Sequence, residues 1–536
     1  MILDILAAFT LILSLFLSAY IIRSLVFFRT AKKMIQEDQL LYHNNNYFSN
    51  SLFKFGSEED NSYVYYDDNI ASDKDTGTTD DANTTRFIHK INNAFSDSNN
   101  KKITPKNLYY NSTSSIIDSS SAPFVSIVVP ARNEHLVIDR LMASCATLTY
   151  NRDNFEIIVV DDDSEDGTFD IVRKWMDNIP NLKVIRRSKR TKGWKGGVLN
   201  LALNNMNTNT SYVLVVDADN ILVSDILERF VSCFANSFPK YGRNCIDVIQ
   251  GYPIPWMYSN SGINSDYNLK KGSSGSSNLN WIARGIDFRL AQRYMIEFVA
   301  KERMNLPVQI VGSLFMVRSE IIKSIGFSND LSEDWDLTLD LYLSSYSSFN
   351  NMQRQYYEKS KKKKAIVVFD PSLISYNEVI TSLTSYLRQR MRVSEGHTRG
   401  FRRKLVTILL SKTLHFTNKI ELFFTGLQYV KFIPLLALII IDSSTILLST
   451  PIGLFYMISN NDLVKLSLLV QAANLFTAIG IIRMSMPICL NIRKYNTKDA
   501  LYFLFLTLLT VPFLVFGSLR GIIRNEGIFY RTKRNP

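Results

Sequence analysis

The stretch "SYVLVVDADNIL", residues 211 to 222, runs an apolar strand directly into two carboxylates. A strand buried on both faces of a parallel sheet reads as a continuous apolar run, and residues 213–216 fit that pattern. Because side chains alternate along an extended backbone, we expect Asp217 and Asp219 to point the same way. Such close carboxylates repel each other unless a cation lies beside them, so the pair is a candidate site for Mg²⁺ or Mn²⁺. In the metal-free alternative, one of them caps the helix expected from Ser224.

Alternating strands and helices surround this stretch. "FVSIVVP", "FEIIVVDDD", "LKVIRR" and "YVLVVDAD" each read as a strand, and each is followed by a helical pattern. Repeated strand–helix units predict an α/β domain whose mostly parallel sheet has helices on both faces. Ligands of such sheets bind beyond the carboxyl ends of the strands. The acidic clusters of this sequence lie at those ends.

Two further motifs suit a nucleotide. In "EIIVVDDDSEDGT" (156–168) a strand ends in an acidic turn, where Asp161 and Asp162 could accept hydrogen bonds from a ribose or a base. We expect Ser164 and Asp166 to cap the following helix instead. "KGWKGGVLNLAL" (192–203) is a Gly-rich turn that opens a helix, and a pyrophosphate can bind at such a positive helix end.

The second half of the sequence contributes three more motifs. They are "VQIVGSLFMVRSEIIKSIG" (308–326), "LSEDWDLTLDL" (331–341) and "QRMRVSEGHTRG" (389–400). Taken together with "PARNE", "DDDSEDGT", "KGGVLN" and "DAD", their order resembles the family 2 glycosyltransferases. That family has a Rossmann-like nucleotide-sugar-binding fold called GT-A. The last motif resembles the QxxRW signature of the membrane-embedded branch, which includes cellulose and hyaluronan synthases and ceramide glucosyltransferase.

The resemblance implies a role for each matching residue. It implies that Pro130, Glu134, Asp161 and Asp162 bind the donor's nucleoside side, and that Lys195, Asn200, Gln389, Arg390 and Arg392 lie near its diphosphate or sugar. It further implies that Asp219 ligates a divalent metal, supported by Asp217, and that Asp334 is the general base. Val393 stands where the family has a tryptophan that commonly lines the acceptor site.

Asp334 also has a purely structural interpretation. Glu333 and Asp334 open an apparent helix, whose dipole two acids would complement. The implied chemistry asks for more, because an acceptor hydroxyl is a poor nucleophile until a carboxylate takes its proton. Departing diphosphate gathers charge, which a divalent cation and arginines stabilise. Attack opposite the leaving group would then invert the anomeric centre.

Several apolar runs predict a multi-pass membrane protein. "ILDILAAFTLILSLFLSAYII" (2–22) is long enough to cross a bilayer, and further runs occur at 429–457, 463–482 and 499–519. Basic residues follow the first run, which places the next part of the chain in the cytoplasm. Four spans would put the basic tail outside, against the same charge rule, unless a re-entrant or doubled segment lies within 417–457.

The sequence therefore divides into six regions. These are an N-terminal membrane anchor (1–28), a largely disordered polar insert (39–121), the GT-A domain (122–385), an amphipathic segment (386–425), transmembrane helices (426–520) and a basic tail (521–536). The net charge of +12 is concentrated ahead of the later spans, where it suits anionic headgroups or substrate phosphates. No nucleic-acid motif accompanies it, and the four cysteines lack the spacing of a disulfide framework or zinc site.

Three functions are compatible with this sequence. The first is a membrane-bound inverting glycosyltransferase, with a nucleotide diphosphate sugar donor, a divalent metal, and a lipid, lipid-linked or polysaccharide acceptor. The second, a processive polysaccharide synthase, would need a tunnel through the bilayer, for which the spans are few unless the protein oligomerises. The third is a non-catalytic membrane scaffold, which could dispense with Asp334 and the Asp pair. Donor sugar, acceptor and oligomeric state are left open by the sequence.

Overall fold

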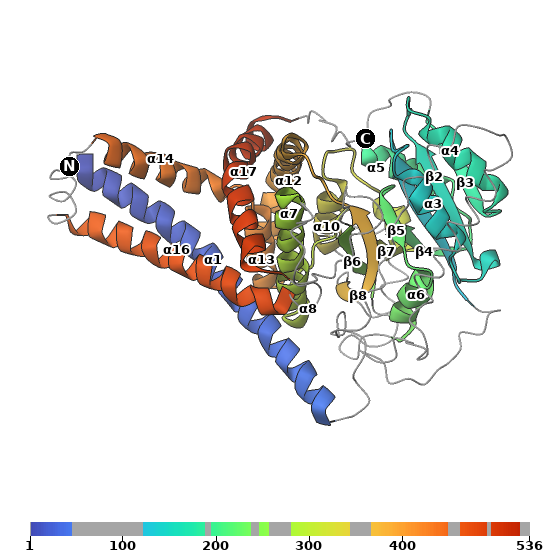
Figure 1. Cartoon of the computed structure of the whole chain (residues 1–536), viewed down its shortest axis with the longest axis horizontal. Helices are drawn as coiled ribbons and strands as arrows, with labels where there is room; N and C mark the ends of the chain where they lie inside the picture. The colour runs from blue at the N-terminus through green and yellow to red at the C-terminus, as the bar shows by residue number, and fades with distance from the viewer. Residues whose placement is uncertain are drawn as a thin grey trace, which may run out of the picture.

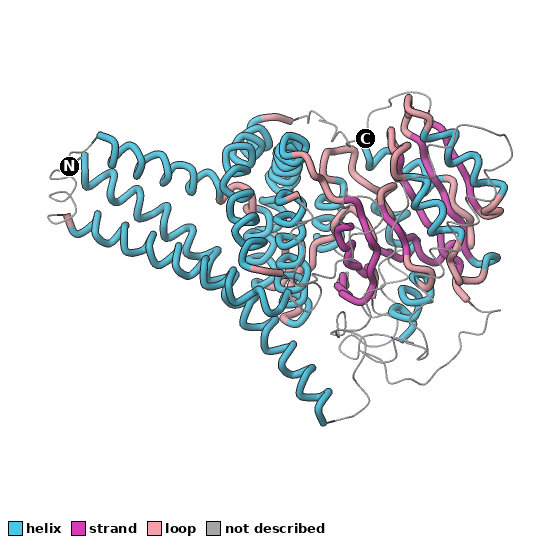
Figure 2. Tube along the Cα trace, in the orientation of Figure 1, coloured by secondary structure: helices cyan, strands magenta, loops and turns pink. Residues whose placement is uncertain are grey.

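The computed structural model places a sheet at one end of the molecule and long helices at the other (Figures 1 and 2). It describes residues 2–44, 122–187, 194–236, 246–256, 280–343, 366–448, 461–489 and 495–525. Two segments of the sequence analysis lie outside these ranges: most of the polar insert and nearly all of the basic tail. The structure leaves the predictions for those segments untested.

The sheet has eight strands in the order β3-β2-β1-β4-β7-β6-β8-β5. They are β1 Phe124–Ala131, β2 Phe155–Asp161, β3 Leu182–Arg186, β4 Thr210–Val215, β5 Asn220–Leu222, β6 Val248–Trp256, β7 Phe315–Arg318 and β8 Val367–Glu378. Strands β3, β2, β1 and β4 are parallel, as are β6 and β8. Strand β7 is antiparallel to β4 and β6, and β5 is antiparallel to β8. The predicted α/β fold with a mostly parallel sheet is confirmed, with the antiparallel strand β7 inserted beside β4 and the antiparallel strand β5 at the edge beside β8.

Hydrophobic cores cover both faces of the sheet, as the continuous apolar strands predict. On β4, Val213 and Val215 belong to one core, whereas Leu214 and the following Val216 belong to the other. Each such side chain, once fully buried, contributes about 1.5–3 kcal/mol of hydrophobic free energy. Helices that contribute to these cores include α3 Ile138–Ala146, α4 Thr168–Lys174, α5 Lys195–Asn204, α6 Ile226–Asn236, α9 Ser319–Ile325 and α10 Glu333–Leu343.

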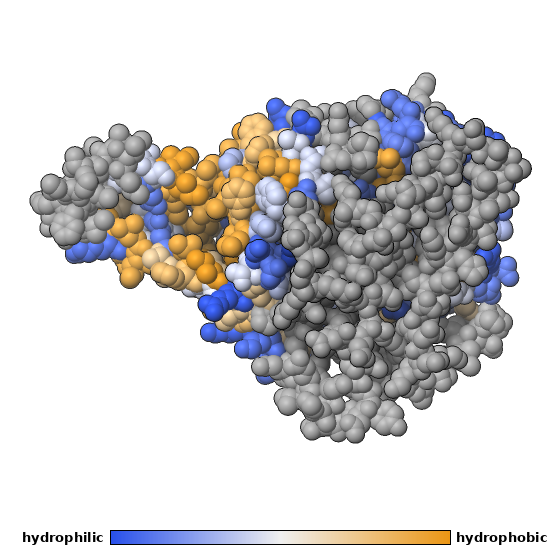
Figure 3. Space-filling model, in the orientation of Figure 1, coloured by the Kyte–Doolittle hydropathy of each residue, from blue (hydrophilic) through white to orange (hydrophobic). Residues whose placement is uncertain are grey.

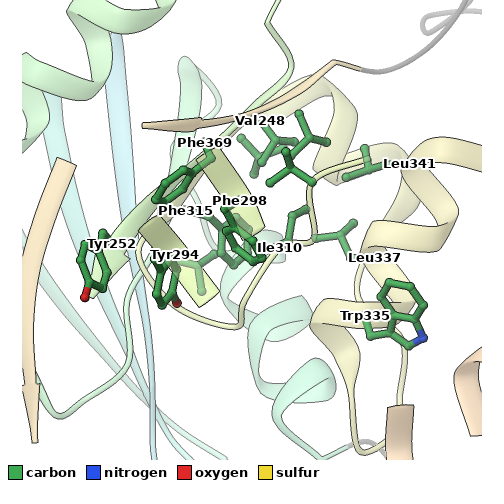
Figure 4. Close-up of a cluster of buried hydrophobic side chains, with 14 of the residues drawn as sticks. Val248, Tyr252, Tyr294, Phe298, Ile310, Phe315, Trp335, Leu337, Leu341 and Phe369 are labelled. Carbon is green, nitrogen blue, oxygen red and sulfur yellow. The ribbon is translucent and has the colours of Figure 1, made fainter. Parts of the chain in front are cut away.

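An aromatic group joins the sheet to the helical part of the molecule (Figure 4). The ring of Tyr294 lies 4.6 Å from that of Tyr252 on β6 and 5.7 Å from that of Phe369 on β8. Tyr294 belongs to a six-residue π-helix, η4 Arg293–Phe298, which continues α7 Trp281–Gln292 and leads into α8 Val299–Arg303. This continuous helical stretch therefore packs against one face of the sheet.

The remaining helices of the described residues are mostly apolar, except for Leu383–Leu410, which is rich in basic residues. They are α1 Ile2–Asn44, α12 Leu383–Leu410, α13 Phe416–Gly426, α14 Phe432–Leu448, α16 Asp462–Cys489 and α17 Thr497–Ile523. Within the described residues, Asp4–Met34, Asp462–Met486 and Thr497–Ile523 are long and apolar enough to cross a membrane. The fourth predicted run corresponds to a shorter apolar helix, Phe432–Thr445. Apolar surface covers the arm of helices that points away from the sheet (Figure 3).

Ion pairs fasten the first span to the interior. Arg23 on α1 lies 2.9 Å from Glu297 of η4 and 2.5 Å from Glu421 of α13. Lys301 on α8, which is fully buried, pairs with the same two carboxylates at 2.9 and 3.0 Å. Removing one member would leave an uncompensated charge in a dry site, so the group holds α1 in a fixed register.

A second set of ion pairs, here called the paired network, connects α12 with α10 and α17. Its members are three arginines and three acids: Arg399, Arg403, Arg520, Asp330, Asp336 and Glu395. Arg399 has no exposed surface and lies 2.7 Å from Asp330 and 2.6 Å from Glu395. Arg520 of α17 approaches the other oxygen of Glu395 at 3.2 Å. The network thus ties a candidate membrane span to the segment that precedes α10.

Candidate active site

The Asp217–Asp219 pair lies on a turn between β4 and β5. Strand β4 ends at Val215, so the alternation of an extended strand does not orient these side chains. Both carboxylates are nevertheless partly exposed while Ala218 between them is buried, as the sequence predicted. The backbone N–H of Asp217 donates to the hydroxyl of Ser313 at 2.9 Å, which fixes the turn against the loop before β7.

Lys195, the first residue of α5, connects this turn to α10. Its Nζ donates to Asp217 Oδ1 at 2.5 Å and to the Gly312 carbonyl at 2.8 Å, and it lies 3.4 Å from Glu333 Oε1. Burial lowers the pKa of Lys195, but the carboxylates of Asp217 and Glu333 outweigh this and raise its pKa above the usual value. The next residue, Gly196, leaves room for the Ser328 carbonyl, which a Cβ would meet.

Two acids begin α10 beside this lysine: Glu333, which is buried, and Asp334, which is partly exposed. Burial raises the pKa of Glu333 to about 7, and the Lys195 ammonium opposes that shift. Burial also raises the pKa of Asp334, whose Oδ1 accepts the Trp335 N–H at 2.8 Å. The neighbouring Asp334 carboxylate adds to the raised pKa of Glu333. A carboxylate with a raised pKa is suited to taking a proton from a hydroxyl.

The acidic turn after β2 is engaged with the protein itself. Asp162 is buried and pairs with Arg187 at 2.9 Å and Arg132 at 3.4 Å. Asp161 is also buried, and its Oδ2 accepts the Ser164 N–H at 3.2 Å. Their charges are therefore largely balanced within this turn.

The neighbouring turn after β1 carries two more predicted donor residues. Pro130 lies near the end of β1, paired in register with Val160, and is partly exposed. Glu134 donates its backbone N–H to Thr168 Oγ1 at 2.8 Å, and its side chain is partly exposed. The turns after β1 and β2 lie side by side at one edge of the sheet. Pro130 and Glu134 are therefore close to the acidic turn that follows β2.

The predicted helix caps are half right. Asp166 accepts the backbone N–H of Thr168, the first residue of α4, at 3.1 Å. The Ser164 hydroxyl instead accepts the Asn133 N–H at 2.8 Å, so Ser164 joins the two turns and does not cap the helix. Gly167 occupies the cap position with φ 87°, a conformation that glycine adopts without strain.

Asn200 on α5 uses its side chain to hold a loop. Its Nδ2 donates to the Phe327 carbonyl at 2.8 Å, and its Oδ1 accepts the Phe327 N–H at 2.9 Å. Both ends of the amide are thus bound to backbone between α9 and α10. This contact fixes α5, which carries Lys195, relative to the segment that leads to Glu333.

The arginine motif divides between two sides of α12. Residues two apart on a helix point in nearly opposite directions. Burial lowers the pKa of Arg392, and the carboxylates of Glu333 and Asp217 oppose that shift, which places Arg392 on the side of the acids. Arg390 lies over the Tyr429 ring, 5.2 Å from its centroid, and Gln389 beside it is partly exposed.

Two supporting residues escaped the sequence analysis. Ser313 receives the backbone of Asp217, and the fully buried Gln250 donates to the Ser313 carbonyl at 3.0 Å while accepting the Val311 N–H at 2.8 Å. Gly312 between them has φ 47° and presents its carbonyl to Lys195. The only signal was a Gly-Ser pair just before an apolar strand, which many loops share.

His397 has a structural role in this arrangement. Its ring stacks on the Trp335 ring at 4.3 Å with an interplanar angle of 12°, and its Nε2 lies 2.7 Å from the Gln428 amide nitrogen. Burial lowers the pKa of His397 well below its usual value, so the imidazole is neutral. The histidine therefore packs behind α10.

The carboxylates at the turn fit a hard divalent cation. Within the described ranges no three His, Cys, Asp or Glu residues come together as a metal-binding group. Asp217 and Asp219 would supply at most two oxygen-donor side chains, both partly exposed. Mg²⁺ and Mn²⁺ accept such a set, because they keep waters and share phosphate oxygens of a substrate.

This fold and site define a nucleotide-sugar-dependent type of transferase, and comparison with known families gives the same class. The model of glycosyl transferase family 2 matches residues 126–239, and that of glycosyl transferase family group 2 matches residues 212–516. The second match covers more than half of the chain, which therefore belongs to the family 2 glycosyltransferases. The family resemblance and the GT-A type of fold are confirmed, and the particular branch stays a prediction.

Individual relatives are similar over different lengths. Beta-monoglucosyldiacylglycerol synthase from Trichormus variabilis is 39% identical over 230 residues, which are 42% of this chain and 42% of that protein. A probable glycosyltransferase from Sulfolobus acidocaldarius is 24% identical over 427 residues, covering 77% and 78% of the two chains. The solved mannosyltransferase PcManGT from Pyrobaculum calidifontis, in complex with GDP-Man and Mn²⁺, is 16% identical with a TM-score of 0.49, covering 76% of this chain and 90% of its own. The match to the first relative spans less than half of that protein's length.

Proposed function

We propose that this protein is a membrane-bound inverting glycosyltransferase that moves a sugar from a nucleotide diphosphate sugar to a hydroxyl of a lipid acceptor. One observation carries the proposal: Lys195 joins Asp217 of the β4–β5 turn to Glu333, the neighbour of Asp334. Carboxylates suited to a donor's metal and carboxylates suited to an acceptor's proton thereby share one small region.

The donor would lie across the carboxyl ends of β1, β2 and β4. Glu134, Asp161 and Asp162 would face the nucleoside, with Pro130 shaping the turn beneath it. Asp161 and Asp162 are already balanced by the chain's own groups, so they offer hydrogen-bond acceptors rather than free charge. This suits a neutral ribose or base.

The diphosphate would lie between the β4–β5 turn and α12. Asp219, supported by Asp217, would hold Mg²⁺ or Mn²⁺, which when bound supplies charge stabilisation for a departing diphosphate. Gln389 and Arg392 would face the same group from α12. Lys195 keeps Asp217 in place, and Asn200 keeps α5 in register with the loop before α10.

Asp334 would act as the general base. It takes the proton of the acceptor hydroxyl while that oxygen forms a bond to the anomeric carbon, and the bond from that carbon to the diphosphate oxygen breaks. Attack from the face opposite the diphosphate inverts the anomeric centre in one step. The raised pKa of Asp334 makes its carboxylate a stronger base than an exposed aspartate.

A lipid acceptor agrees with the helices around the site. α12 packs along α17, a candidate membrane span, so an acceptor bound at α12 could keep its tail in the bilayer. The relative named beta-monoglucosyldiacylglycerol synthase has a lipid in its product name. We propose that the catalytic domain faces the cytoplasm, because basic residues follow the first span.

The test is turnover of UDP- and GDP-sugars by purified protein in lipid vesicles, with and without Mg²⁺ or Mn²⁺. Asp334→Asn and Asp219→Ala should each lower turnover about 100-fold or more, because they remove the base and a metal ligand. Asp177→Asn, at an exposed position, is the matched control and should retain full turnover. Unchanged turnover in both site variants would refute the proposed function.

A further inference from the structure

Three arginines from three helical segments gather beside α12, and we call them the arginine cluster. They are Arg289 of α7, Arg293 of η4 and Arg390 of α12. Arg289 and Arg293 are four residues apart on one continuous helical stretch, so they share a face. Ile286 of α7 and Tyr386 of α12 belong to one hydrophobic cluster, and Arg289 and Arg390 follow them by about one helical turn. Desolvation and the guanidinium groups of Arg390 and Arg293 lower the pKa of Arg289, which agrees with this placement.

The hydrogen-bond and ring-contact partners of Arg293 and Arg390 are neutral, while Arg293 also lowers the pKa of the Glu297 carboxyl from a greater distance. Arg293 Nη2 donates to the side-chain amide oxygen of Gln309, Oε1, at 2.8 Å. Arg390 lies over the Tyr429 ring. The buried Nε of Arg289 has no hydrogen-bond partner among the described residues. Within the part of the chain that the structure describes, no carboxylate lies within 4.0 Å of any of the three guanidinium groups. All three side chains are half-buried and keep some exposed surface.

An unbalanced cluster of this kind is costly unless it binds an anion. Like charges repel, and partial burial removes the water that would screen them. A guanidinium group presents N–H donors in a planar fork that matches phosphate oxygens, and several such forks can surround one phosphate. The π-helix that begins at Arg293 is a second indication of a binding site, because π-helical turns occur often at functional sites.

The cluster lies between the proposed base and the membrane helices. Desolvation raises the pKa of Asp334, and Arg293 acts against that shift, so Arg293 is near the base. On the other side, the Trp281 ring of α7 lies 5.4 Å from Phe505 of α17, and Tyr429 precedes the apolar helix α14. A phosphate held there would have a lipid tail on one side and Asp334 on the other.

We propose that the arginine cluster binds the phosphate of the acceptor lipid, so that the acceptor is an anionic phosphate-bearing lipid and not a neutral diacylglycerol. This inference rests on the proposed function, because it assigns the acceptor of the same site. The diphosphate of the sugar donor would offer the same kind of phosphate oxygens to these arginines. We assign the cluster to the acceptor because Arg390 turns away from the acids that Arg392 faces.

The experiment measures binding to the purified full-length protein in detergent, without turnover. The probes are dioctanoyl phosphatidic acid, dioctanoylglycerol with the same chains, and UDP or GDP with Mg²⁺. We expect the phosphorylated lipid to bind at least about tenfold more tightly than the neutral one. Arg289→Gln and Arg293→Gln should each lower the affinity for phosphatidic acid about tenfold or more, while changing the affinity for the nucleotide less than about twofold.

Two further variants keep the result decisive. Arg303→Gln removes an exposed charge from the end of the same helical stretch and should leave both affinities unchanged. Arg293→Lys keeps the charge without the planar fork of N–H donors and should give an intermediate loss of affinity for the lipid.

Equal binding of both lipids to the unaltered protein would overturn the inference. Loss of nucleotide affinity with lipid affinity intact would also overturn it, by assigning the cluster to the donor. A protein that binds phosphatidic acid as expected but shows no sugar turnover would refute only the proposed function.

Discussion

Helix α12 carries buried arginines in two different settings. In the paired network, Arg399 is enclosed by Asp330 and Glu395, and its charge is cancelled inside the protein. In the arginine cluster, Arg390 has phenol and guanidinium neighbours, and among the residues that the structure describes no carboxylate lies within 4.0 Å of it. A cancelled charge fixes helices together, whereas an uncancelled one keeps its capacity to bind an anion. The same residue type therefore serves architecture at one place and recognition at another, about two turns away.

The largest expected effect comes from breaking the paired network. Glu395→Ala should destabilise the protein by about 3–5 kcal/mol, because it leaves the buried guanidinium groups of Arg399 and Arg520 without their shared carboxylate. The measurement is the thermal unfolding midpoint of the purified protein. Glu165→Ala, at an exposed position, should leave the midpoint unchanged. A midpoint for Glu395→Ala equal to that of the control would show that the network does not hold the helices.

Lys195, like Arg399, is a cation whose charge is balanced by neighbouring carboxylates. Unlike Arg399, it lies at the candidate active site. Lys195→Met should lower turnover about 100-fold, or about 2.7 kcal/mol, because Asp217 and Glu333 lose the cation that positions them. Steady-state kinetics at saturating donor would measure this. Lys183→Met removes a lysine whose ion pair with Glu156 lies outside the site, and it should retain activity. Equal effects of the two substitutions would remove Lys195 from the mechanism.

How far the sequence predicts this molecule depends on the range of the interaction. Strands β1 to β4 and the helices between them follow from local apolar patterns, and their acidic ends were predicted as site residues. The β4–β5 turn was mistaken for extended strand, because the chain leaves the sheet at Val215 only when it meets Ser313 from a distant loop.

The bridge from Lys195 to Glu333 and the arginine cluster could not be predicted in the same way. Each joins side chains that lie more than 90 residues apart in the chain, and no local pattern encodes such a meeting. Arg289 and Arg293 occur in a helix that reads as an ordinary amphipathic segment. Only the packing of that helix against α12 makes them neighbours of Arg390.

A smaller effect concerns the titration of Glu333 and Asp334. Turnover needs Asp334 unprotonated, and burial raises the pKa of Asp334, so activity should rise with pH at higher pH than an exposed aspartate would give. Glu333→Gln removes a carboxyl group next to Asp334, so any repulsion between the two is lost and the acidic limb should move to lower pH. The pH profile of kcat/KM measures this shift.

Asp340→Asn is the control for the pH profile. Asp340 lies on the same helix, is partly exposed and pairs with Lys404 away from the lysine bridge. Its removal should leave the acidic limb where it is. An acidic limb that stays fixed in Glu333→Gln, or moves to higher pH, would mean that the two carboxylates do not titrate as a pair.

The smallest expected effect tests the comparison itself. Arg289→Gln should leave the unfolding midpoint unchanged or raise it slightly, within about 0.5 kcal/mol, because it removes repulsion from Arg390 and Arg293 and breaks no ion pair. Arg399→Gln, measured beside it, should cost about 3–5 kcal/mol, because Asp330 and Glu395 would lose their partner in a dry site. Both substitutions replace a helical arginine by glutamine. The difference between their unfolding midpoints therefore reports the different surroundings of Arg289 and Arg399. If Arg289→Gln lowered the midpoint as much as Arg399→Gln, the arginine cluster would be part of the architecture, and its capacity for an anion would have to be sought elsewhere.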